Sequence, residues 1–103
     1  MPTNAEVIDG LEASKKALED QCNGASGATF LKLLTSIQHV ADEVGALEAL
    51  TLDTADYVPQ TDPFRKGTAD AQAFQATLES LKTIFGLASK LAQAADTLIK
   101  YIK

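Results

Sequence analysis

Apolar residues recur at steps of three and four along most of this chain, the spacing that places them on one face of an α-helix. The pattern predicts three helices, over about residues 4–22, 28–50 and 69–102. The link between the first two is only a few residues long, which makes them antiparallel neighbours. We therefore expect an all-α fold, an antiparallel three-helix bundle with a long structured loop before the C-terminal helix, forming a single domain over residues 1–103.

The second predicted helix separates apolar from polar positions most clearly. Its apolar face consists of Phe30, Leu33, Leu34, Ile37, Val40, Ala41, Val44 and Leu47. Its opposite face carries Lys32, Thr35, Gln38, His39, Asp42 and Glu43. A stripe of this width is typical of a surface helix that packs one side on a core.

Polar residues mark the expected helix ends. Thr3 or Asn4 can cap the first helix, and Thr68 or Asp70 can cap the third, because their side-chain oxygens accept from free backbone N–H groups. Asn23-Gly24 can end the first helix, since both residues tolerate the left-handed backbone of a C-terminal cap.

The third predicted helix is the longest, at about 33 residues and about 50 Å. The first two would measure about 28 and 37 Å, so part of the third lacks a full-length partner. Three arrangements can cover the excess: the preceding loop folds back along it, the helix bends near Gly86, or a second molecule supplies the surface. Its main apolar stripe comprises Phe74, Leu78, Leu81, Phe85, Ala88, Ala92, Ala95, Ile99 and Ile102.

Residues 51–69 have a different composition, rich in Thr, Asp, Pro and Gly, which is typical of a loop. A loop of this length is unusual inside a compact domain. It also contains Tyr57, Val58 and Phe64, which we expect to attach it to the bundle. A functional role for the loop is the alternative.

Charge is distributed unevenly along the chain, whose formal net charge is −5. Residues 71–103 carry four lysines and two acids, whereas the residues before them are net acidic. The basic segment can pack against the acidic one or contact an acidic partner or anionic lipid. The overall acidity argues against nucleic acid as a partner, because phosphate binding needs a basic surface.

The compartment is inferred from what the sequence lacks. It shows neither a signal-peptide pattern nor an apolar run long enough to span a bilayer, so cytoplasmic residence is the default and leaderless secretion stays open. The single cysteine, Cys22, excludes a disulfide scaffold within the chain. We expect it to be a half-buried small apolar residue, with an intermolecular disulfide or reactive thiol as the alternative.

No pattern of titratable residues indicates catalysis. The only histidine, His39, is three and four residues from Asp42 and Glu43, a spacing that favours a surface ion pair. It lacks the further ligands of a zinc site. Pairing of His39 with Cys22 as a nucleophile would need both on one face, and their predicted faces differ.

Two other patterns fall short of known sites. The acids at positions 53, 56 and 62 lack the spacing of a calcium loop. The glycines around position 25 lack the ending of a phosphate loop. We therefore expect no catalytic, cofactor or metal residues and no enzyme activity.

These observations predict a small acidic helical protein that acts through protein–protein interaction, with self-association as one form of it. The interaction residues expected on the third helix are Phe74, Leu78, Leu81, Phe85 and Ile99. The alternative is a secreted or membrane-active helical effector that uses the long amphipathic C-terminal helix, whose end carries Lys100 and Lys103.

Overall fold

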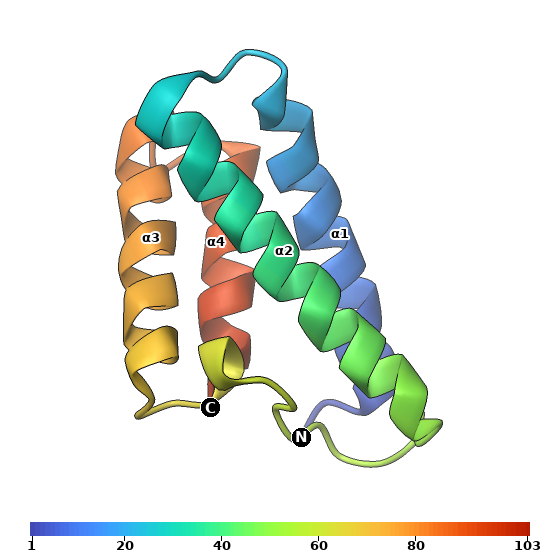
Figure 1. Ribbon diagram of the computed structural model, residues 1–103. Helices are drawn as coiled ribbons and strands as arrows, with labels where there is room; N and C mark the ends of the chain where they lie inside the picture. Colours follow the sequence, from blue (N-terminus) through green and yellow to red (C-terminus); the bar gives the residue numbers. More distant parts are fainter.

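Four α-helices and one 3₁₀ turn make up the structure, a computed structural model of residues 1–103. In chain order they are α1 (Asn4–Cys22), α2 (Gly27–Leu50), η1 (Asp62–Phe64), α3 (Ala69–Phe85) and α4 (Lys90–Tyr101). Successive helices run in opposite directions, and both chain ends lie at the same end of the bundle (Figure 1). The all-α prediction is confirmed, and the prediction of three helices is wrong, because the bundle has four.

The missed feature is a hairpin within the predicted helix over residues 69–102. The backbone of Gly86 has φ +97°, a conformation that favours glycine, and it ends α3. Ser89 then caps α4, because its Oγ accepts from the N–H of Ala92 at 3.0 Å. An ion pair of 2.6 Å between Lys82 Nζ and Asp96 joins the two arms. Folding back lets both halves bury their apolar stripes within the chain.

The predicted caps are confirmed at Thr3 and Thr68. Thr3 and Glu6 form a reciprocal capping box at the start of α1, in which each side chain bonds the other residue's N–H. The Thr68 Oγ1 accepts from the N–H of Ala71 at 2.9 Å and begins α3. These caps fix where the helices start independently of the core.

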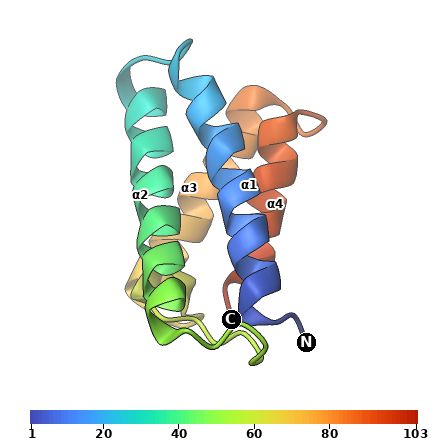
Figure 2. The same ribbon diagram turned by 90° about the vertical axis from the view of Figure 1, so that its right-hand side faces the viewer.

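The core lies along the middle of the bundle and takes side chains from every helix. α1 packs against both α2 and α4, and α4 also packs against α3 (Figure 2). Phe64 of η1 meets Phe74 of α3 edge to face, with ring centroids 5.3 Å apart. The largest buried apolar side chains are Leu11, Leu18, Leu33, Leu47, Tyr57, Phe64, Phe74, Leu78, Leu81, Leu91 and Leu98.

The connection between α2 and α3 is held along its length by backbone hydrogen bonds. The N–H groups of Asn4 and Ala5, free in the first turn of α1, donate to the carbonyls of Ala55 and Asp53. The Tyr57 N–H donates to the Pro2 carbonyl at 2.9 Å. The expected attachment of this loop to the bundle is therefore present, and residues 53–57 are held at the start of α1.

None of the helices is both long enough and apolar enough to cross a bilayer.

Candidate functional site

The residues predicted to contact a partner on the third helix lie largely inside this chain. Phe74, Leu78 and Leu81 are buried in the core, and Phe85 and Ile99 are half-buried against it. Their stripe is covered by α1, α2 and the other arm of the hairpin, because the turn at Gly86 folds α4 onto α3. These five residues stabilise the fold, and the exposed surface lies elsewhere.

The three loop residues expected to attach the loop, Tyr57, Val58 and Phe64, differ in burial. Tyr57 and Phe64 are buried in the core, as expected for residues that attach the loop. Val58, between them in sequence, points to solvent. Phe64 belongs to the 3₁₀ turn η1, whereas Tyr57 enters the core from the stretch before that turn.

Glu43 is the centre of the loop's attachment to α2. Its carboxylate is fully buried and accepts four hydrogen bonds, two on each oxygen. The donors are the Tyr57 hydroxyl, the Gln60 N–H, and the N–H and hydroxyl of Thr61, at 2.6 to 2.9 Å. We call this group the Glu43 clasp.

The sequence prediction of Glu43 as a surface residue is wrong. Its position follows Val40 by three residues and precedes Leu47 by four, so it falls on the buried side of α2. That spacing could have indicated that Glu43 is buried. The polar partners of its carboxylate, however, lie 14 to 18 residues away in the loop.

Tyr57 is held as a hydrogen-bond donor by its surroundings. Burial raises the pKa of its hydroxyl, and the charge of Glu43 and the hydrogen bond to it raise the pKa further. The hydroxyl therefore keeps its proton and donates to Glu43 across the physiological pH range.

His39 packs on α3 instead of pairing with Glu43. Its ring meets Phe74 edge to face at a centroid distance of 5.0 Å. Burial lowers the pKa of His39, and the nearby carboxylates of Asp42 and Asp70 partly oppose that effect. The predicted ion pair between His39 and Glu43 is wrong, because the Glu43 carboxylate accepts the hydrogen bonds of the clasp. The other predicted partner, Asp42, accepts a hydrogen bond from Gln38 at 2.8 Å.

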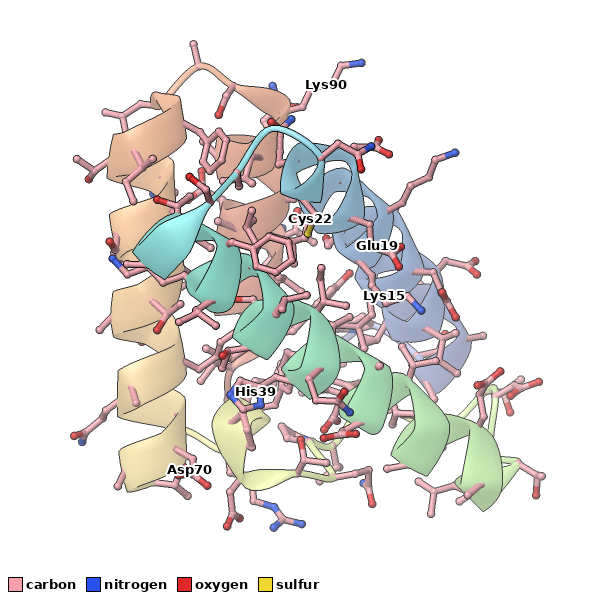
Figure 3. The ribbon with its side chains drawn as sticks, turned by 45° about the horizontal axis from the view of Figure 1, so that its top comes forward. Lys15, Glu19, Cys22, His39, Asp70 and Lys90 are labelled. Atoms are coloured by element: carbon pink, nitrogen blue, oxygen red, sulfur yellow. The ribbon has the colours of Figure 1, made fainter.

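Cys22 is half-buried near the end of α1, as expected, and its Sγ lies 3.6 Å from the Leu18 carbonyl. Figure 3 shows Cys22 and His39 well apart, so the structure does not bring the cysteine and histidine together. No three His, Cys, Asp or Glu residues are grouped so that they could hold a metal ion.

Large apolar side chains are exposed where α2 begins and α3 ends. Leu31 and Leu34 on α2 are 64% and 43% exposed, and Ile84 and Leu87 are 48% and 75% exposed. A hydrogen bond of 2.8 Å from Lys32 Nζ to Ser80 Oγ joins the two helices nearby. Both segments lie at the same end of the bundle (Figure 1). We call these four residues the apolar end.

Leu34 was predicted to face the core, but it lies at the edge of the buried stripe of α2. The remaining exposed apolar residues are spread over the N-terminus, the end of α2 and the loop: Met1, Leu50, Leu52 and Val58. The apolar end differs from these scattered residues, because its members lie on α2, on α3 and in the turn that follows α3, and a hydrogen bond joins the two helices.

Comparisons with known proteins add no family to this description. No family model matches the sequence, and neither a curated protein nor a solved structure is significantly similar to the chain.

Proposed function

We propose that this protein is a non-catalytic interaction protein that binds an apolar surface of another protein through its apolar end. The observation that carries the proposal is the exposure of Leu31, Leu34, Ile84 and Leu87 at one end of the bundle. Scattered single apolar residues are normal on a protein surface, whereas a group of them indicates a contact site.

The setting of these residues supports a preformed site. Three of them are carried by helices, and the bond between Lys32 and Ser80 joins those helices. A rigid apolar surface loses little conformational freedom on binding, which favours affinity. Cytoplasmic residence and the absence of nucleic acid among its partners belong to the same proposal, the latter because the chain is net acidic.

Paired leucine substitutions test this proposal. The double variant Leu31→Asp with Leu87→Asp places two charges at the apolar end without touching the core, and Leu52→Asp is a matched control in the loop. A protein captured by the wild type and the control should be lost with the double variant. With purified partner, the dissociation constant should rise at least about tenfold, because burying two introduced carboxylates in an apolar contact costs more than about 1.4 kcal/mol.

Equal binding by the double variant and the control would refute the proposal. A weaker candidate is a membrane-surface function, which the proximity of Leu87 to Lys90 favours. The same variants distinguish it: vesicles with anionic lipid would sediment the wild type and release the double variant, with no protein partner present.

A further inference from the structure

A small pocket lies beside the end of α4, at the end of the bundle opposite the apolar end (Figure 1). Its volume is about 280 Å³, and it is lined by Pro2, Lys100, Tyr101 and Lys103. Two of its four lining side chains are therefore cationic, in a chain whose formal net charge is −5. We call it the basic pocket.

Backbone hydrogen bonds fix the two sides of the basic pocket. On one side, the Tyr57 N–H donates to the Pro2 carbonyl at 2.9 Å. On the other side, the Lys103 N–H donates to the Phe64 carbonyl at 3.0 Å. The Lys103 carbonyl also accepts from the Lys66 N–H at 2.6 Å. Because both sides are tied to the same connection between α2 and α3, the pocket is formed before any ligand arrives.

The basic pocket also has an aromatic side. The ring of Tyr101 lines it and is half-buried. The Tyr101 hydroxyl lies against Gly10 of α1, and Tyr57 meets the Tyr101 ring edge to face with centroids 6.0 Å apart. These contacts hold the Tyr101 ring in place. Together with Pro2, it offers a fixed surface on which a flat apolar group can pack.

Neither lysine of the basic pocket has an anionic partner within the chain. Lys100 and Lys103 are both exposed, and none of the ion pairs includes either of them. Asp9 and Asp56 each adjoin in sequence a residue that packs on Tyr101, but they form no ion pair with the two lysines. The pocket therefore holds two positive charges that no ion pair of the chain neutralises.

The end of α4 accounts for only one of these charges. A lysine in the last helical turn is stabilised by the helix dipole, which explains Lys100. Lys103 lies beyond the helix, and its Nζ stands 5.5 Å from the centroid of the Tyr57 ring, a cation–π contact that orders the side chain. Two like charges in one pocket repel each other, and an anion bound between them removes that repulsion.

We propose that the basic pocket binds a phosphate monoester carried on a single small ring. Such a phosphate has a charge of about −1.5 to −2 at pH 7, which matches two lysines, whereas a carboxylate has a single charge. Lysine binds phosphate as a compact point charge, while the planar two-point contact that suits a carboxylate favours arginine. The ring packs on Tyr101 and Pro2, and it is small because the pocket lies just below the usual range of about 300–1,000 Å³ for ligand sites.

Titration of the protein with phenyl phosphate, followed by amide NMR spectra, tests this proposal. We expect saturable shifts at the amides of Lys100, Tyr101 and Lys103, with a dissociation constant of about 1 mM or lower. The variant Lys100→Gln with Lys103→Gln should bind about fivefold more weakly or worse, because it removes both ion pairs to the phosphate. Lys90→Gln removes an exposed, unpaired lysine from the other end of α4, and this control should bind like the wild type.

Two further probes separate the phosphate from the ring. Inorganic phosphate has the charge without the ring, and benzoate has the ring with a single negative charge. Both should therefore bind several-fold more weakly than phenyl phosphate, the first because it buries no apolar surface and the second because it neutralises one lysine only. Binding of either probe as tight as that of phenyl phosphate overturns the assigned class of ligand.

Two results overturn the site itself. One is the absence of saturable shifts with phenyl phosphate up to about 10 mM. The other is equal binding by the variant Lys100→Gln with Lys103→Gln and by Lys90→Gln, with both shown to be folded by circular dichroism. The apolar-end variant Leu31→Asp with Leu87→Asp should bind phenyl phosphate like the wild type. That result separates this proposal from the proposed binding of another protein.

Discussion

Substitution of Glu43 should be among the most destabilising single changes in this protein. Glu43→Ala removes the acceptor of four hydrogen bonds that join the loop to α2. The Tyr57 hydroxyl then stays buried without a partner, whereas the N–H groups of Gln60 and Thr61, which are only partly buried, can turn to water. The perturbation therefore lies mainly at one hydroxyl and in the loosened loop.

The expected magnitude follows from these contacts. A buried donor left without an acceptor costs about 1–3 kcal/mol, and each hydrogen bond to a charged group contributes about 1.5–3 kcal/mol net. Because the part-buried donors recover water, we expect Glu43→Ala to lower the free energy of unfolding by about 3–5 kcal/mol. A domain of this size has about 5–15 kcal/mol in total.

Two measurements check this prediction. Urea unfolding followed by circular dichroism gives the loss of stability, with Glu48→Ala, an exposed acid on the same helix, as the control within about 0.5 kcal/mol of wild type. Hydrogen exchange at the amides of Gln60 and Thr61 should accelerate. Glu43→Gln keeps one acceptor oxygen and should lose about 2 kcal/mol.

A loss below about 1 kcal/mol for Glu43→Ala would refute the reasoning, because it would mean that the clasp contributes no more than a surface contact. Unchanged exchange at Gln60 and Thr61 would refute the assignment of those amides to the carboxylate.

Three further predictions concern single positions. Gly10→Ala should destabilise the bundle by about 1–3 kcal/mol, because the added methyl group overlaps the Tyr101 hydroxyl, and thermal unfolding measures the loss. Gly45→Ala, in an open position of α2, should raise the free energy of unfolding by up to about 1 kcal/mol. Gly86→Ala should lower it by about 1 kcal/mol, because φ is +97° there. Urea unfolding should therefore show changes of opposite sign for the two variants. Burial lowers the pKa of His39 below 6.5, so the unfolded chain binds the proton more readily than the folded chain. The free energy of unfolding should be constant above about pH 6.5 and should fall as the pH drops toward the folded-state pKa. Urea midpoints measured over this pH range should fall less steeply for a His39→Gln variant than for the wild type, which would confirm that His39 is the cause.

The sequence predicted the helical content, most of the core and two caps, because these depend on local spacing. It could not show the hairpin at Gly86. The four residues from Gly86 to Ser89 preserve the alternation of three- and four-residue steps, so the apolar pattern continues unchanged through the turn. The excess length of the predicted helix was the only sign, and a bend there was one of three arrangements that could explain it.

The clasp and the exposed surface were beyond sequence reasoning for a different reason. Burial of Glu43 depends on donors from a loop whose path only the folded chain defines. Phe74, Leu78 and Leu81 were predicted to contact a partner because the long predicted helix lacked a full-length neighbour in the chain. In the structure, other helices of the same chain cover these residues.

The position of α4 between α1 and α3 bears on how the protein is made. α1 emerges from the ribosome well before α4, yet the two helices are neighbours in the bundle. Until Leu91, Ala95 and Leu98 have been synthesised, the apolar faces of the earlier helices have no cover on that side. Native packing is therefore expected only after translation has passed α4, and the nascent chain exposes aggregation-prone surface until then.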